Sequence, residues 1–296
     1  MKVKKVLILG LDALEYDLVE KWDLKNLKQE EYGKTILPIS REDGYLYPEP
    51  ATVIVWPCFI TGMPPKKMGI QTVKIYPFNI LYKFYLKYIY PQEDEKKKRS
   101  IKDKSVYRKL MDNISNIISS LHLSREPNRE DIKVPSMFDV IPNSIHRHIP
   151  TYDKDAFPNR GMVVKALENS MYKPIFEKHA IKEFNERTKE VIEYIEKNNW
   201  NLFMEYFSVL DGIQHVFYNK PNKIAKFYLM FDEFVGKVRE KIDDDTLLLI
   251  VSDHGQKRGL HTDYGFYSAN KPLGLKNPKL IDFRWIIEDI LGKNER

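Results

Sequence analysis

Three strongly apolar segments, each followed by an aspartate, constrain what this chain of 296 residues can fold into. They cover residues 3–11, 202–210 and 246–252, and the aspartates that follow them are Asp12, Asp211 and Asp253. Stretches with helical spacing of apolar residues lie between these segments. Continuous apolar strands separated by helices predict an α/β fold, in which helices cover both faces of a mostly parallel central sheet.

The spacing of apolar residues also predicts where the helices lie. We expect them over residues 14–22, 24–32, 52–61, 224–242 and 281–291, with one or two more between 165 and 197. Gly33 is expected to end the second of these helices, Gly62 the third, and Asn222 to cap the fourth. His146 and His148 alternate along a predicted strand, so we interpret both as structural residues on one face of it.

The middle of the chain, residues 73–130, has a different composition. It is rich in Lys and Tyr, it carries a run of charged residues over 93–99, and residues 106–121 form an amphipathic stretch. Five aromatic residues cluster here, namely Tyr82, Phe84, Tyr85, Tyr88 and Tyr90. We interpret this segment as a helical cap inserted into a core made of residues 1–72 and 131–296.

Composition excludes several classes of protein. With 43% hydrophobic residues the chain can bury a sizeable core, so bulk disorder is excluded. A single cysteine, Cys58, excludes a disulfide framework and any multi-cysteine metal site. The net charge of +6 is small for a dedicated nucleic-acid binder. Without an apolar run of roughly 18 residues or a signal peptide, we expect no transmembrane segment and a cytoplasmic location.

Histidines accompany the strand-end aspartates. His215 follows Asp211 by four residues, which places both on one face of a helix. His254 directly follows Asp253, and His261 comes seven residues later. A single aspartate at a strand end is commonly a helix cap, and a single Asp–His pair is commonly a surface hydrogen bond. The joint pattern at the carboxyl ends of parallel strands, where ligands gather, instead predicts a functional site.

The motifs that surround these residues resemble one known family. Five motifs occur in the same order along the chain as in that family. They are residues 9–13 (Leu-Gly-Leu-Asp-Ala), Thr52 with the Thr61-Gly62 pair, residues 210–215, residues 252–255 (Ser-Asp-His-Gly) and residues 259–261 (Gly-Leu-His). By these motifs the chain resembles the alkaline phosphatase superfamily, and within it the type I phosphodiesterase/nucleotide pyrophosphatase family. The resemblance covers both ends of the chain and leaves residues 73–130 uncovered. It implies an alkaline phosphatase-like fold.

The resemblance implies a site for two divalent metal ions. Asp12, Thr52, Asp253 and His254 would hold one ion, and Asp211, His215 and His261 would hold the other. Imidazole and carboxylate ligands without thiolate suit zinc best, and manganese or iron are alternatives. Two such ions can stabilise the attacking and the leaving oxygen of a phosphoryl transfer.

The resemblance further implies that Thr52 is the catalytic nucleophile, which would carry a covalent phosphoryl group. The backbone N–H of Val53 would donate to a phosphoryl oxygen of the substrate. A threonine that merely caps the helix is the structural interpretation, and it is compatible with this role. The chain departs from the family after this helix, because Gln71-Thr72-Val73 stands where nucleotide pyrophosphatases place an asparagine that contacts the phosphoryl group.

Together these features predict a metal-dependent hydrolase of phosphoric ester or phosphoanhydride bonds, with phosphodiester or pyrophosphate cleavage favoured. The expected substrate is a phosphorylated small molecule or a nucleotide-like compound. A phosphomutase or a phosphonate hydrolase would use the same site. A protein that binds nucleic acid or a membrane surface through residues 73–130 is a further alternative, which leaves the metal ligands unexplained. The sequence does not determine the oligomeric state.

Overall fold

The computed structural model describes residues 3–75 and 124–292, and its centre is a six-stranded sheet with the order β2-β8-β5-β1-β4-β3. The strands are β1 (Lys5–Leu11), β2 (Glu31–Ile36), β3 (Ser144–Arg147), β4 (Leu202–Phe207), β5 (Thr246–Ser252) and β8 (Tyr264–Ala269). Strands β3, β4, β1 and β5 are parallel, whereas β8 runs antiparallel to β5 and to β2. The predicted α/β fold with a mostly parallel sheet is confirmed.

The three apolar segments form the middle of this sheet. Strand β1 lies between β4 and β5, and all residues of β4 and β5 are buried. Strands covered by helices on both faces have no solvated side, which explains their uninterrupted apolar sequences. Strand β4 ends at Phe207, earlier than the predicted end at residue 210, because the next residues begin a helix.

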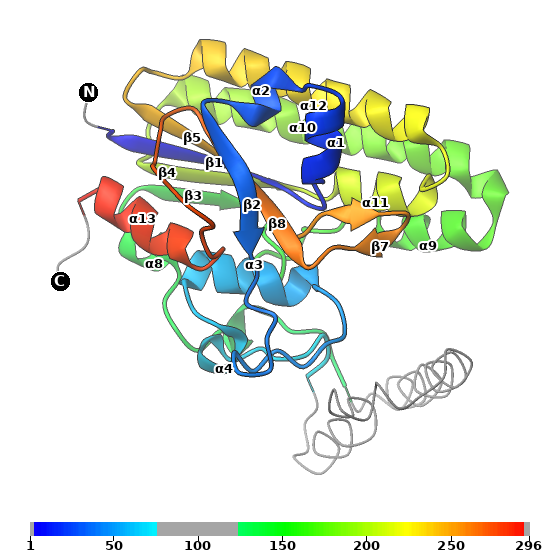
Figure 1. Ribbon diagram of the computed structural model, residues 1–296, viewed down its shortest axis with the longest axis horizontal. Coiled ribbons are helices and arrows are strands. Elements are labelled where there is room, and N and C mark those ends of the chain that lie inside the picture. Colours follow the sequence, from blue (N-terminus) through cyan, green and yellow to red (C-terminus); the bar gives the residue numbers. More distant parts are fainter. Residues whose placement is uncertain (1–2, 76–123, 293–296) are drawn as a thin grey trace.

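Helices cover the two faces of the sheet (Figure 1). The helices on one face are α1 (Tyr16–Lys21), α2 (Lys25–Lys28), α10 (Lys173–Lys197), α11 (Val209–Val216) and α12 (Pro221–Lys241). Helices α3 (Thr52–Thr61), α4 (Pro65–Met68), α8 (Met137–Val140) and α13 (Asp282–Ile290) pack on the other. Helix α9 (Arg160–Glu168), the 3₁₀ turns Arg129–Asp131 and Ser170–Tyr172, and the small hairpin β6 (Gln256–Lys257) and β7 (Leu260–His261) complete the described elements.

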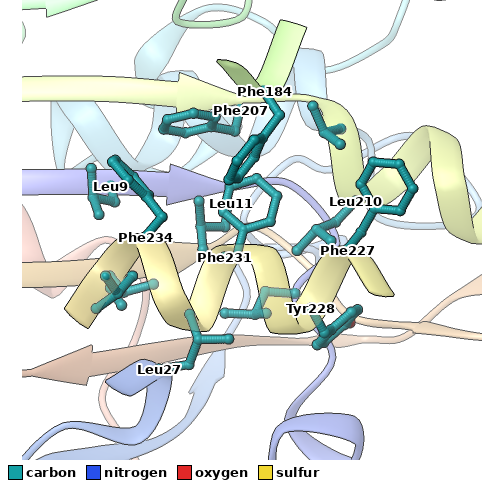
Figure 2. Packing of buried hydrophobic residues seen from close by; sticks show 14 of the residues in the cluster. Leu9, Leu11, Leu27, Phe184, Phe207, Leu210, Phe227, Tyr228, Phe231 and Phe234 are labelled. Carbon is teal, nitrogen blue, oxygen red and sulfur yellow. The ribbon is translucent and has the colours of Figure 1, made fainter. Parts of the chain in front are cut away.

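The first face holds a core dominated by aromatic side chains. Figure 2 shows Phe231 and Phe234 of α12 packed against Phe184 of α10 and the strand residue Phe207, with Phe227 further along α12. The rings of Phe207 and Phe231 meet edge to face, with centroids 5.3 Å apart. This packing fixes the long helices α10 and α12 on the parallel strands.

Three local predictions are wrong. Residues 24–32 form the short helix α2 and then enter strand β2, so Gly33 lies in a strand and does not end a helix. A Cβ on Gly33 would lie 3.1 Å from the ring of Tyr267, which shows that packing on β8 selects glycine here. Helix α12 begins at Pro221 with Lys220 at its cap, so Asn222 does not cap it. His148 follows the end of β3 with a positive φ of 61°, so only His146 belongs to the strand.

Helix α3 contains a proline in its interior, and a side chain from another segment replaces the hydrogen bond that this proline cannot make. Pro57 has no N–H to donate to the carbonyl of Val53, four residues earlier. The hydroxyl of Thr151 donates to that carbonyl instead, at 2.8 Å. The first turn of α3 is therefore tied to the loop that follows β3.

The expected insertion at residues 73–130 lies mostly outside the described residues, including the aromatic cluster, the charged run 93–99 and the helix predicted over 106–121. Its two ends are described, and they meet. Ile75 and Arg125 exchange backbone hydrogen bonds of 2.8 and 3.1 Å. The chain thus leaves and re-enters the core at one point, and the division into core and cap stays a prediction. In the described ranges no helix has both the length and the apolar character that a membrane span requires.

The close approach of α3 to β1 gives a test of the packing. A Cβ on Gly10 would lie 2.8 Å from the buried ring of Trp56 and 3.2 Å from Met204. We expect Gly10→Ala to lower the free energy of unfolding by about 1–3 kcal/mol, since overpacking forces these side chains to shift. Urea denaturation measures this change. Gly161→Ala is the matched control, because nothing lies within 4 Å of its Cβ and a helical Gly→Ala change is stabilising by about 0.5–1 kcal/mol. An unchanged unfolding midpoint for Gly10→Ala would contradict this account.

Candidate functional site

The three predicted aspartates come together because their strands are neighbours and parallel. Asp12 follows β1, Asp253 follows β5, and Asp211 lies in the first turn of α11, which starts two residues after β4. The backbone N–H of Asp12 donates to the carbonyl of Phe207 at 3.0 Å, so the ladder between β1 and β4 continues to the site. All three carboxylates therefore lie close together at the carboxyl ends of the parallel strands.

The hairpin β6–β7 brings the last histidine back to the same place. Gln256 pairs with His261 across the hairpin, and the N–H of Gly255 donates to the hydroxyl of Thr262 at 2.9 Å. As a result His261 stacks on His254, with ring centroids 3.9 Å apart and planes 17° apart. A Cβ on Gly255 would clash with the carboxylate of Glu15. This explains why glycine follows His254.

The predicted residues form two adjoining groups. Asp12, Asp253 and His254 are completely buried, and His254 Nε2 lies 3.4 Å from one oxygen of each aspartate. Their candidate ligand atoms lie within 4.8 Å of one another. Asp12 Oδ1 and both oxygens of Asp253 lack a hydrogen-bond partner among the described residues. Buried carboxylate oxygens without partners are costly, so this donor group fits a bound cation.

The second group is closer to solvent. His215 Nε2 lies 3.2 Å from Asp211 Oδ1, and His261 Nε2 lies 3.5 Å from the same oxygen. The two imidazole nitrogens are themselves 3.0 Å apart. Asp211 Oδ1 also lacks a hydrogen-bond partner within the described part of the chain. Two imidazoles and a carboxylate converging on one point fit a transition-metal ion such as zinc.

Two of the histidines are oriented by backbone carbonyls. His261 Nδ1 lies 2.8 Å from the carbonyl of Pro50, and His254 Nδ1 lies 3.2 Å from that of Gly255. These contacts favour a proton on Nδ1 and leave Nε2 of each ring facing the aspartates. An imidazole held by its second nitrogen in this way is typical of metal-binding histidines.

The charges of the two groups depend on one another. Burial, together with the nearby charges of Asp253 and Asp211, raises the pKa of Asp12 well above its usual value. Burial acts in the same direction on Asp211, but hydrogen bonds and charge from His215 and His261 hold its pKa below the usual range. Burial lowers the pKa of His261, yet its interaction with Asp211 outweighs burial and raises the pKa to about 9. Asp12 therefore needs further positive charge nearby to stay ionised, whereas the two imidazoles already favour the ionised form of Asp211.

Thr52 stands at the first position of α3, beside the buried group. Its Oγ1 lies 3.4 Å from His254 Nε2. The Tyr45 hydroxyl accepts from the N–H of Ala51 at 2.7 Å and donates to the carbonyl of Glu49, which shapes the turn before the helix. Within the described residues no backbone carbonyl accepts the N–H of Val53. The helix start therefore offers a hydroxyl, a free N–H and the positive end of a helix dipole.

A cavity of about 290 Å³ opens next to Thr52. Its walls combine apolar and polar side chains, and they include Thr52, Val53, Asp211 and His261 of the site together with Phe157, Val163, Phe176, Asn159, Arg160, Glu183 and Ser208. Lys74 and Glu126, which flank the ends of the insertion, line the same cavity. The rest of a substrate whose reacting group lies at Thr52 would occupy this cavity.

Tyr206 is a residue of this site that the sequence analysis missed. It is completely buried in β4, and its hydroxyl donates to Asp12 Oδ2. It was interpreted only as part of an apolar strand. A buried tyrosine hydroxyl generally requires a polar partner, so a tyrosine in a fully apolar strand indicates a polar group nearby in the fold.

Comparisons with solved structures agree with the observed fold. The chain aligns with alkaline phosphatase from the Antarctic bacterium TAB5 at 12% identity and a TM-score of 0.53, covering 99% of both chains. It matches murine ectonucleotide pyrophosphatase/phosphodiesterase 5 at 16% identity (TM-score 0.46) and phosphonoacetate hydrolase from Sinorhizobium meliloti 1021 at 12% (TM-score 0.47). It spans 57% of the length of each of these two proteins. No curated protein matches the sequence.

The family model for type I phosphodiesterase/nucleotide pyrophosphatase matches residues 6–285, which is nearly the whole chain. The match includes every residue of the two groups described above. It confirms the family that the motifs indicated and the expected class of enzyme, a hydrolase of phosphoric ester or phosphoanhydride bonds. The chain belongs to the type I phosphodiesterase/nucleotide pyrophosphatase family, and its fold is similar to that of an alkaline phosphatase.

Proposed function

We propose that this protein is a metal-dependent phosphodiesterase or pyrophosphatase that acts through a phosphothreonine intermediate on Thr52. The observation that carries the proposal is the position of the Thr52 hydroxyl, 3.4 Å from His254, at a helix start beside two groups of candidate metal ligands. Its substrate would be a phosphorylated small molecule or a nucleotide-like compound. The family and the cavity beside Thr52 support this function.

The two groups would each hold one divalent ion. Asp12, Asp253, His254 and Thr52 would bind the buried ion, and Asp211, His215 and His261 would bind the other. The ligand types favour zinc, and manganese or iron would also be accepted. When bound, the two ions would supply positive charge that favours the ionised Thr52 hydroxyl and the departing oxygen.

The side chains of this chain would then carry out a two-step displacement. Thr52 Oγ1, having lost its proton, attacks phosphorus and forms a phosphothreonine as the bond to the leaving oxygen breaks. The N–H of Val53 donates to a phosphoryl oxygen, and the dipole of α3 favours the negative charge that develops there. Water then attacks the phosphorus of this intermediate, which still carries the second substituent of a diester. The step breaks the bond to Thr52 Oγ1, releases the substituted phosphate and returns a proton to the Thr52 hydroxyl.

The cavity supports a substrate with a second substituent on phosphorus. Phe157, Val163 and Phe176 offer apolar surface to that substituent, while Asn159 and Ser208 offer polar groups. A monoester would leave one of these spaces empty and bring an additional negative charge. Diesters and pyrophosphates therefore suit the cavity better than monoesters do.

The first prediction concerns metal content. We expect Asp253→Asn and Asp211→Asn each to remove about one divalent ion per chain, because each breaks one group of ligands and leaves the other in place. Elemental analysis of protein purified without chelator measures the content. His146→Ala serves as the control, since this histidine contacts Asp153 and belongs to neither group. Metal content that stays the same in both aspartate variants would overturn the assignment.

The second prediction concerns the nucleophile. Thr52→Ala is expected to reduce turnover by at least about a thousandfold, because no hydroxyl remains to take the phosphoryl group. Thr52→Ser should keep part of the activity. Both variants should retain the metal ions, since the other ligands stay. Steady-state kinetics and elemental analysis together test this, and normal turnover by Thr52→Ala would indicate direct attack by water.

The third prediction concerns the substrate class. After metal reconstitution, bis-p-nitrophenyl phosphate should be cleaved with a higher kcat/KM than p-nitrophenyl phosphate, because the cavity accommodates the second aryl group. Val163→Trp, which would narrow the cavity, should lower kcat/KM for the diester more than for the monoester. Release of p-nitrophenol is the measurement. A preference for the monoester by the unaltered enzyme would contradict the proposed diesterase.

A further inference from the structure

A second cluster of potential metal ligands lies away from the residues of the proposed active site. It consists of His148, which follows β3, Glu190 of α10, and Glu205 of β4, and their candidate ligand atoms lie within 4.8 Å of one another. None of these residues belongs to the two groups around Asp12 and Asp211. The three come from separate segments of the chain, so only the folded protein brings them together.

Glu205 is the unusual member of the cluster. It sits in the middle of an otherwise apolar strand and is completely buried. His148 Nδ1 lies 2.7 Å from its Oε1, whereas Oε2 has no hydrogen-bond partner among the described residues. Leaving a carboxylate oxygen unpaired in the interior is unfavourable, and proteins generally pair it with a donor or a cation.

The two nearest guanidinium groups contact residues other than Glu205. Arg187 donates to the backbone carbonyls of Tyr206, Asp155 and Ala156, and it lies 3.3 Å from Glu183. Arg147 Nε lies 2.5 Å from Glu190 Oε1, so Arg147 pairs with a member of the cluster and not with Glu205. Neither guanidinium donates a hydrogen bond to Glu205 within the described residues.

The cluster is negative overall and open to solvent. A cavity of about 250 Å³ borders His148 and Glu190. The acidic residues of the cavity and cluster are Asp155, Glu183, Glu186, Glu190 and Glu205, and the cationic ones are Arg147, Lys182 and Arg187. The carboxyl groups around the cluster thus outnumber the cationic side chains, which favours binding of a cation over binding of an anion.

We propose that His148, Glu190 and Glu205 form a binding site for a third divalent metal ion, separate from the proposed catalytic pair. One imidazole and two carboxylates are the ligand types of a zinc or manganese site, and water from the cavity would complete the coordination. The ion would join the end of the edge strand β3 to α10 and β4. Its role would be structural, because none of its ligands lines the cavity beside Thr52.

The backbone at His148 supports this assignment. Its φ of 61° lies in the left-handed region, where residues with a Cβ are strained. That conformation turns the chain at the end of β3 and places the imidazole against Glu205. A strained conformation that positions a side chain is a common feature of binding sites.

The decisive experiment is elemental analysis of the full-length protein reconstituted with Zn²⁺ and desalted. We expect His148→Ala and Glu190→Gln each to contain about one ion fewer than the unaltered protein. Glu186→Gln is the matched control, because Glu186 lines the same cavity but is not part of the ligand cluster, and it should retain all ions. Circular dichroism checks that each variant is folded, and Glu205 is left unaltered because its burial makes misfolding a concern.

A second measurement separates this proposal from the proposed catalytic site. In a variant with Asp211→Asn and Asp253→Asn, bound Co²⁺ should still give a visible d–d absorption, and adding His148→Ala should remove it. This comparison does not depend on whether the catalytic pair binds metal. Two results would overturn the proposal and show that the cluster is only a network of ion pairs. One is equal metal content in the unaltered protein and in His148→Ala, and the other is a Co²⁺ absorption that does not change when His148→Ala is added.

Discussion

Repulsion among buried carboxylates is the constraint on which the rest of this site depends. Asp12 and Asp253 are completely buried and both lie 3.4 Å from one imidazole nitrogen, with Asp211 held by the histidines next to them. At a separation of about 4 Å, two like charges in a protein repel by about 4 kcal/mol. The parallel sheet nevertheless places them at adjacent strand ends. Such an arrangement is stable only if a proton on Asp12 or bound cations compensate it. Binding of the proposed metal ions would therefore be coupled to folding.

Thr52, the proposed nucleophile, is positioned by packing that is equally restrictive. Helix α3 lies so close to β1 that only glycine fits at position 10 beneath Trp56. Pro57 removes a hydrogen bond from the first turn, and Thr151 replaces it from the loop after β3. Thr52 is therefore held by contacts with two parts of the sheet. A rigid helix start presents its hydroxyl and N–H groups to a substrate without a further ordering cost.

The sequence predicted the centre of the fold better than its edges. The apolar segments before Asp12 and Asp253 could be predicted as strands because burial on both faces requires uninterrupted apolar residues. Strand β2 contains Lys34 and Gly33 and is only partly buried, so its pattern does not differ from that of a short helix or loop. The candidate site residues that the structure brings together could be predicted because they follow strands or lie in local motifs. Tyr206 and Glu205 were not, because their partners Asp12 and His148 are distant in sequence.

Strand β4 links the two sites through the alternation of its side chains. Neighbouring residues of a strand point to opposite faces, so Tyr206 reaches Asp12 while Glu205 points to His148 and α10. Arg187 of α10 also donates to the carbonyl of Tyr206 itself. An ion bound by Glu205 and Glu190 would join β4 to α10 one residue away from the tyrosine that contacts Asp12. An ion that holds β4 and α10 together at Glu205 would therefore act on the same stretch of strand that holds the Tyr206 hydroxyl against Asp12, without touching the substrate.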